Sequence, residues 1–538
     1  MKSFKEIILH NISAKIAFFV FFLVSIVFTY PLIFKFNSVV LGFFSSDEIY
    51  GALRQFWWYK YSWLKHISYV TDHLIAAPFG FQHQQIFIYP LWAALAIWLS
   101  IITNEIFTYN LITLISLLCS AIFIYYLTYY LTKNIFSSIF SGIAYAFCPY
   151  YFVRAWQHLG LTQIQWFPLC LLALFKLRQE VKFKNALICA FAFFIVVAFD
   201  YQYAYFTAIL TAVFILFLIF NNWKFKIKNF AYFRNDLKVI RLVLFSGILA
   251  FLFSLPATYS MLSGIIKHPT GNASVYNPYR RPFEDLFSQS ARPLSYFLPA
   301  TSHPIFGKIT EKFIGSFLYG ESFTEHTLYL GWVPLILAFI TFRKWWKNRK
   351  LQVVEKENFY IGFFIFLVIT AWFFSQPPWW RIGPIKIYMP SFFMYKILPM
   401  FRAYCRFGIV VMLAVAVLAG FGLKFILEKF KKTKIKIAIT CIFSGLVLFE
   451  FWNWPPFKVI EVSGAPQVYY WIKGQPQDFA IAEYPLDTDG PNELYKFYQA
   501  KHEKKIINGT FPGTYANKVA NTITKLSDPQ TAGVLKWM

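Results

Sequence analysis

Long apolar runs alternate with short basic segments along most of the chain. Runs long enough to cross a bilayer as helices occur at about eleven places. They cover residues 14–35, 106–131, 134–153, 159–176, 186–200, 203–221, 242–262, 326–342, 358–375, 406–427 and 436–452. The pattern therefore predicts an α-helical polytopic membrane protein with about eleven transmembrane helices.

Composition agrees with this pattern. Of the 538 residues, 58% are hydrophobic and only 14% are charged, a balance outside the range of soluble domains. The formal net charge of +26 would suggest nucleic-acid binding in a soluble protein. Here, however, Lys and Arg cluster in loops between apolar runs, as in membrane proteins that follow the positive-inside rule. We therefore expect the lipid bilayer, and no nucleic acid, as a partner.

The basic loops also set the predicted orientation. Segments such as KLRQEVKFK (176–184), RKWWKNRK (343–350) and EKFKKTKIK (428–436) should all be cytoplasmic, which places the N-terminus in the cytoplasm and the chain in the cell membrane as a multi-pass protein. These loops can all be cytoplasmic only if the apolar stretch 86–102 does not cross the membrane, because each crossing changes the side of the next loop. We therefore expect this stretch to be re-entrant or interfacial. The first outer loop, residues 36–105, would contain this stretch and other juxtamembrane helices.

After residue 452 the composition becomes more polar. The segments FAIAEYPL (479–486) and KKIING (504–509) are typical of strands, and NKVANTITKL (517–526) is typical of a helix. We therefore predict a transmembrane domain over residues 1–452 and a small extracytoplasmic α/β domain over residues 453–538. The final residues carry no turn or capping signal, so this domain is expected to be incomplete.

The cysteines show no spacing typical of a metal or redox site. The six are Cys119, Cys148, Cys170, Cys189, Cys405 and Cys441. No CxxC pattern occurs among them, so neither a zinc site nor a disulfide framework is predicted, and the thiols are expected to be inert. No cofactor and no metal site is predicted from motifs, with a divalent metal left as an open alternative.

Two adjacent carboxylates open a predicted helix in the first outer loop. In GFFSSDEIYGALRQFWW (42–58), Ser45 and Glu48 have the S-x-x-E spacing of a capping box, so Asp47 and Glu48 could simply start the helix. The chemical alternative is that Asp47, Arg54 and Trp58 share one helical face and present a reactive carboxylate beside a guanidinium and an indole. The apolar face of this helix is expected to lie in the bilayer interface.

Two further outer segments place basic residues four positions apart. They are PYYFVRAWQHLGL, with Arg154 and His158, and LPMFRAYCRFG, with Arg402 and Arg406. At this spacing each pair can share a helical face, and two arginines on one face suit a phosphate better than each other. His158 can donate a hydrogen bond or a proton. The alternative for Arg154 is an arginine that snorkels to lipid headgroups.

Two other polar residues lie at predicted outer turns. Asp200, in FDYQYAYF, stands between two helices, where a carboxylate either caps a helix or contributes to an outer-face site. His326, in TEHTLYLGW, is expected to be structural rather than catalytic.

The whole layout resembles the GT-C superfamily of polytopic glycosyltransferases. The likeness rests on Asp47 in a long outer loop directly after the first helix, on the juxtamembrane helices, on the helical core and on the extracytoplasmic C-terminal domain. The segments RAWQHLGLTQIQWFPLCLLAL, LPMFRAYCRFGIVVMLAVAVLAGFG, FAIAEYPLD and HEKKIINGTFPGT are similar to segments of largely uncharacterised prokaryotic members. The chain departs from many members by carrying Gln157 and His158 where they have a second acidic residue.

This resemblance implies an inverting transfer of a sugar from a polyprenyl-phosphate carrier to an extracytoplasmic glycan, lipid or protein acceptor. Asp47 would be the base that takes the proton of the acceptor hydroxyl. Further catalytic candidates are Glu48 and His158. The implied donor-phosphate ligands are Arg54, Arg154, Arg402 and Arg406, and the other outer-face candidates are Asp200 and Trp58.

Two other classes of protein remain as alternatives. A polytopic transporter or flippase of a lipid-linked or small solute would need ionisable residues or broken helices near the bilayer midplane, and the apolar runs carry essentially none away from their ends. A non-catalytic membrane scaffold would present the C-terminal domain and would not need Asp47.

Overall fold

The transmembrane region of the computed structural model is built from helices that match the predicted apolar runs. The structure describes residues 4–42, 47–82, 90–225, 230–267, 280–350, 356–453, 457–476, 478–484, 486, 491–510, 517–518 and 521–522. Within these residues every predicted run contains a helix. These helices are α1 (Phe4–Phe28), α4 (Glu105–Thr132), α5 (Ile135–Ala146) followed by α6 (Pro149–Ala155), α7 (Trp166–Gln179), α8 (Phe183–Phe199), α9 (Tyr201–Phe225), α10 (Phe230–Lys267), α14 (Trp332–Lys350), α15 (Lys356–Ser375), α17 (Gly408–Leu427) and α18 (Thr433–Glu450).

Several of these helices are long and apolar enough to cross a membrane. Among the described residues five pass this test, namely α4, α9, α10, α15 and α17, and six do so if α5 and α6 form one broken span. The chain is therefore a multi-pass membrane protein, while the number of about eleven crossings stays a prediction. The axes of α5 and α6 meet at 44°, where Pro149 opens α6 without a backbone N–H to donate.

Helix α17 lies at the centre of the bundle. Nearly all of its residues are buried, and α4, α5, α14 and α15 pack around it. Glycines allow close approach: a Cβ at Gly420 would lie 2.4 Å from Oγ of Ser141, and one at Gly422 would lie 2.1 Å from the Leu337 carbonyl oxygen. The outer end of this tightly packed helix carries the 3₁₀ turn η5 (Tyr404–Phe407), so η5 rests on a rigid base.

Two predicted spans are wrong at their first residues. The run 159–176 begins as a 3₁₀ turn, η3 (Leu159–Thr162), and α7 starts only at Trp166. The run 326–342 is preceded by the short helix α13 (Phe323–His326), and α14 starts at Trp332. Apolar composition continues past the helix ends because these turns are also buried, and the irregular backbone there brings polar side chains together.

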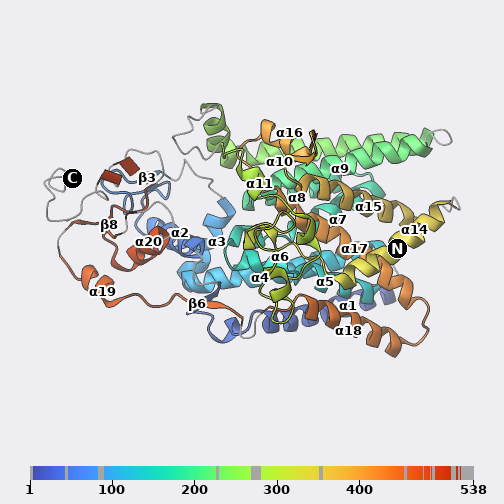
Figure 1. Ribbon diagram of the computed structural model, residues 1–538, viewed down its shortest axis with the longest axis horizontal. Coiled ribbons are helices and arrows are strands. Elements are labelled where there is room, and N and C mark those ends of the chain that lie inside the picture. Colours follow the sequence, from blue (N-terminus) through green and yellow to red (C-terminus); the bar gives the residue numbers. More distant parts are fainter. Residues whose placement is uncertain are drawn as a thin grey trace.

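The first outer loop and the C-terminal segment fold together. Strand β1 (Val39–Leu41) pairs antiparallel with β6 (Val459–Glu461), and α2 (Asp47–Leu64) packs against both α20 (Pro491–His502) and α3 (Pro90–Ile102). Figure 1 shows α2, α3 and α20 together at one end of the long axis, beyond the helix bundle. The two parts predicted as separate domains thus share one packed region, which we call the outer unit.

The predicted interfacial face of α2 is wrong. Ile49, Leu53 and Phe56 are at most 5% exposed and pack in a core that also contains Ile460 and Phe497. Residues more than four hundred positions away in sequence cover this face, so the apolar pattern of α2 alone could not distinguish protein core from lipid.

The predicted C-terminal strands are present but short. They are β7 (Ala480–Ile481) and β8 (Lys505–Ile506), which pair in parallel. The predicted helix at 517–526 falls mostly outside the described residues. The remaining elements are η1 (Leu32–Phe34), β2 (Thr71–Asp72), β3 (Phe81–Gln82), α11 (Asp285–Ser288), η4 (Pro293–Tyr296), α12 (Gly307–Glu311), β4 (Trp379–Ile382), β5 (Ile385–Tyr388), α16 (Pro390–Ile397) and α19 (Gln467–Lys473).

Candidate functional site

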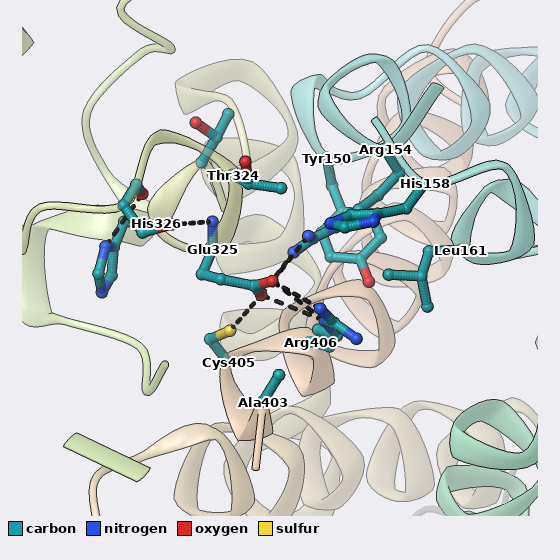
Figure 2. Close-up of polar contacts among 12 residues, drawn as sticks. Tyr150, Arg154, His158, Leu161, Thr324, Glu325, His326, Ala403, Cys405 and Arg406 are labelled. Atoms are coloured by element: carbon teal, nitrogen blue, oxygen red, sulfur yellow. Dashed lines mark hydrogen bonds and ion pairs between the residues drawn. The ribbon is translucent and has the colours of Figure 1, made fainter. Parts of the chain in front are cut away.

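A buried carboxylate joins three segments at the end of the bundle next to the outer unit. Glu325, in α13, accepts hydrogen bonds from Nη1 and Nη2 of Arg154 at 3.0 and 2.8 Å. Nη2 of Arg406 lies 2.7 Å from its Oε1, and Sγ of Cys405 lies 2.9 Å from its Oε2. Figure 2 shows the carboxylate enclosed by the two guanidiniums and the thiol. Cys405 is a free, buried thiol that donates a hydrogen bond to Glu325.

The charge state of Glu325 follows from these contacts. Burial disfavours the ionised carboxyl, but the two guanidiniums of Arg154 and Arg406 outweigh it and hold the pKa of Glu325 well below its ordinary value. Locally, Oγ of Ser322 caps α13 by accepting from the Glu325 N–H at 3.1 Å. The cap fixes the backbone, while the side chain is left to pair with the arginines.

The two arginines differ in what they can still bind. Both terminal nitrogens of Arg154 are engaged by Glu325, its side chain is 0% exposed, and its guanidinium lies 4.9 Å from the centre of the Tyr150 ring. Arg406 directs Nε and Nη2 to Glu325 and Nη1 to Oε1 of Gln202 at 2.5 Å, and its side chain is 17% exposed.

A guanidinium has five N–H groups, so these contacts leave Arg406 one N–H on each of Nη1 and Nη2. We call this pair of N–H groups the open edge of Arg406. Two parallel N–H groups match the spacing of two oxygens of a phosphate or carboxylate.

The start of α2 meets the turn after α6. Nδ1 of His158 contacts Oε2 of Glu48, with the Glu48 side chain 64% exposed and that of His158 19% exposed. Surrounding protein disfavours the ionised carboxyl, but His158 and the charge of Arg406 outweigh this and lower the pKa of Glu48. Because the carboxylate engages Nδ1, Nε2 is the ring nitrogen left for another partner.

Asp47 is the first residue of α2 and directly precedes Glu48. Its side chain and the predicted capping box with Ser45 lie outside the described residues. The backbone position alone puts Asp47 at the end of α2 that contacts His158.

Asp200 lies on the same side of the bundle. Its Oδ1 accepts from the Tyr203 N–H at 2.7 Å, so the predicted capping role is confirmed. The residue is 8% exposed, and burial raises its pKa to about 6, with the Tyr203 N–H and the charge of Arg406 acting in the opposite direction. Gln202, two positions after Asp200, is the residue that binds Arg406.

Arg54 and Trp58 lie away from this cluster, in the outer unit. Arg54 is 4% exposed; its Nη2 lies 3.0 Å from Oδ2 of Asp72 and its Nε donates to Oε1 of Gln499 at 2.8 Å. The guanidinium lies 5.4 Å from the Trp58 ring, so these two members of the predicted face are neighbours, while the Asp47 side chain lies outside the described residues. Trp58 itself donates from Nε1 to the Tyr69 carbonyl.

Arg402 is also separate from the cluster. Its Nη1 lies 2.6 Å from Oδ2 of Asp285, and its side chain is 37% exposed. The predicted helical face shared by Arg402 and Arg406 is wrong, because η5 begins only at Tyr404 and α17 at Gly408. The two side chains therefore bind different carboxylates.

Sequence reasoning missed Glu325. It assigned the neighbouring His326 a structural role, and this is confirmed, since both ring nitrogens lie about 3 Å from the backbone carbonyl oxygens of Ser322 and Ser290. A signal was present: the chain has 51 Lys and Arg but only 25 Asp and Glu. An acidic residue just before a span, in a chain with two arginines at other outer ends, is a candidate counter-charge.

The described residues offer no set of side chains for binding a metal ion. The described part of the chain holds no group of three or more His, Cys, Asp or Glu side chains placed to share a metal ion. The side chain of Asp47 falls outside that part.

The chain is similar to known proteins only at the level of solved structures. No family model matches the chain, and no curated protein matches it. An oligosaccharyltransferase from Archaeoglobus fulgidus is similar with a TM-score of 0.48 and 10% identity over 95% of this chain and 66% of that one. The arabinofuranosyltransferase AftD from Mycobacteria is similar with a TM-score of 0.47 and 12% identity over 88% of this chain and 29% of that one. ArnT from Cupriavidus metallidurans bound to undecaprenyl phosphate is similar with a TM-score of 0.37 and 11% identity over 82% of this chain and 63% of that one.

The chain thus spans at most 66% of the length of these three structures. Because every TM-score lies below 0.5, the function has to be inferred from the residues of the site themselves.

Proposed function

We propose that the chain is a membrane glycosyltransferase that moves a sugar from a polyprenyl-phosphate carrier to an extracytoplasmic acceptor with inversion. One observation carries the proposal: the acidic start of α2 contacts His158 within electrostatic range of Arg406. Residues from distant segments therefore bring the Glu48 carboxylate, an imidazole and an arginine close together, and Asp47 directly precedes Glu48 in α2. These are the groups that a displacement at a phosphate-linked sugar requires.

In the proposed reaction Asp47 accepts the proton of the acceptor hydroxyl as that oxygen attacks the anomeric carbon. The bond from the anomeric carbon to the phosphate oxygen breaks, and its electron pair stays on the phosphate. A single displacement of this kind inverts the anomeric centre. Asp47 suits this role because the N-terminus of a helix favours negative charge.

The leaving phosphate gains negative charge as the bond breaks. The open edge of Arg406 can bind two of its oxygens, which stabilises that charge more in the transition state than in the ground state. In the imidazolium form, His158 would donate from Nδ1 to Glu48 and from Nε2 to a third phosphate oxygen. Arg154 serves indirectly, since it is enclosed and holds Glu325.

The test uses the full chain in lipid nanodiscs with polyprenyl-phosphate-linked sugars. We expect release of free polyprenyl phosphate that depends on added acceptor, with the product sugar in the inverted configuration. A transporter or flippase would instead move the lipid-linked sugar between leaflets and leave it chemically intact. Recovery of intact donor with every sugar and acceptor tried, together with such movement, would replace the proposal by that alternative.

A further inference from the structure

Arg406 can present its open edge only if something holds the rest of its guanidinium. Nε and Nη2 both donate to Glu325, with Nη2 2.7 Å from Oε1. Nη1 and Nη2 of Arg154 donate to the same carboxylate, at 3.0 Å from Oε1 and 2.8 Å from Oε2. Glu325 is 5% exposed and Arg154 0% exposed. Two buried, charge-assisted contacts on a rigid base therefore fix the orientation of the Arg406 plane.

We propose that Glu325 is a positioning residue for the phosphate-binding arginine, an inference that rests on the proposed function. Glu325 binds Nε and Nη2 of Arg406 and Gln202 binds Nη1, so by count one N–H remains on each terminal nitrogen for a ligand. Together Arg154, Arg406 and Glu325 carry one net positive charge, opposite in sign to a phosphodiester-linked donor. Glu325 thus limits the directions from which a phosphate can reach Arg406.

Electrostatics and orientation make opposite predictions for the loss of this carboxylate. Removing a negative charge near a phosphate site should strengthen anion binding in general. Loss of orientation should instead remove the advantage that a planar two-donor fork has over a point charge. The two effects are separated by measuring how much Arg406→Lys changes phosphate binding, once with Glu325 present and once with Gln at position 325. The general electrostatic effect of removing Glu325 acts equally with Arg or Lys at position 406, so it cancels in the comparison of the two changes.

The experiment measures binding of farnesyl phosphate and of farnesol to the full chain in nanodiscs; their ratio of affinities is the phosphate preference. Four proteins are compared: wild type, Glu325→Gln, Arg406→Lys and the double variant. We expect Arg406→Lys to lower the phosphate preference at least about tenfold in wild type and less than about threefold when Glu325 is replaced by Gln. Equal losses in the two backgrounds would overturn the positioning role.

Glu450→Gln is the matched control. Glu450 is another carboxylate at an outer helix end; its two oxygens accept from the Trp332 and Val333 N–H groups at 3.1 and 3.2 Å and hold the start of α14. We expect the Arg406→Lys loss to stay at least about tenfold in the Glu450→Gln background. If that background also abolishes the loss, general loosening of the bundle explains the result and the positioning role is rejected.

Glu325→Asp covers the case in which Glu325→Gln does not fold. It keeps the charge but is one methylene shorter, so it cannot reach both arginines equally, and we expect the Arg406→Lys loss to fall below the wild-type value. An unchanged loss would count against positioning. A wild-type protein without any preference for farnesyl phosphate over farnesol would instead reject the proposed phosphate-linked donor, and the inference with it.

Discussion

The protein contains two buried arginine and carboxylate centres that differ in one respect. In the outer unit, Arg54 pairs with Asp72 and Gln499, and its guanidinium is closed in by the rings of Trp57 and Trp58 at 4.8 and 5.4 Å. At the end of the bundle, Arg406 pairs with Glu325 but keeps 17% of its side chain exposed, whereas Arg54 keeps 4%.

This difference separates a structural arginine from one that can bind a ligand. Arg54 is paired through Nε and Nη2 and is almost fully buried, whereas Arg406 is paired through Nε, Nη1 and Nη2 but keeps part of its side chain exposed. Arg406 also lies within electrostatic range of Glu48 at the start of α2. Pairing with a carboxylate is thus not evidence against ligand binding; what matters is which edge of the guanidinium the partner occupies.

The largest expected effect is on stability, from Arg54→Met. The change removes the counter-charge of Asp72, which is 0% exposed, and should lower the free energy of unfolding by about 3–5 kcal/mol. Urea unfolding in detergent, followed by tryptophan fluorescence, measures it. The double change with Asp72→Asn should recover part of the loss, because no unpaired charge is then left buried. A loss below about 1 kcal/mol would mean that the outer unit does not depend on this pair.

Next is the effect of Arg406→Ala on catalysis. Removing one preorganised donor group typically costs about 2.7–4 kcal/mol of transition-state stabilisation, so transfer should fall about 10²–10³-fold. Glu325 keeps Arg154 as a partner, so the thermal unfolding midpoint should change little. Transfer rates with a polyprenyl-phosphate-linked sugar provide the measurement, and a wild-type rate would remove Arg406 from the phosphate site.

A third prediction concerns the pH dependence of stability. Burial raises the pKa of Asp200 from 3.8 to about 6, so the folded state favours the protonated carboxyl. Its contribution to stability is fully present below pH 3.8 and is lost as the pH rises through about 6, a change of up to about 3 kcal/mol. Asp200→Asn should flatten this part of the curve of unfolding free energy against pH. An identical slope in wild type and variant would show that Asp200 does not titrate in this range.

The smallest effect is expected for Arg402→Ala. Arg402 pairs with Asp285 while 37% exposed, and such ion pairs contribute about 0–1 kcal/mol. Transfer should therefore stay within about threefold of wild type, in contrast to Arg406→Ala. Equal losses for the two variants would restore the sequence-based interpretation, in which both arginines bind the phosphate.

The parts of the fold that follow from local pattern were predictable. The lengths of the apolar runs predicted the long helices of the bundle. The positions of polar residues at the predicted turns indicated a helix cap as one role for Asp200 and a structural role for His326. The starts of α7 and α14 were not predictable, because buried turns have the same apolar composition as helices. The core position of α2 was not predictable either, since part of its cover comes from the C-terminal segment.

The candidate site was predictable as a set of residues but not as an arrangement. Arg154, His158 and Arg406 were singled out by spacing, yet their partners lie 81 to 171 positions away in the sequence. Glu325 was missed because its two arginine partners come from distant segments, and no local spacing around residue 325 points to them.

The central claim is tested most directly by Asp47→Asn in an assay with a polyprenyl-phosphate-linked sugar, with farnesyl phosphate binding measured on the same preparation. Asn is an equally good helix cap, so the variant should fold and bind farnesyl phosphate within about threefold of wild type. Because Asn cannot accept the hydroxyl proton, transfer should fall about 10²–10⁴-fold. Full transfer by Asp47→Asn, in an assay where Glu48→Gln abolishes it, would assign the base to Glu48; full transfer by both variants would contradict catalysis at the start of α2.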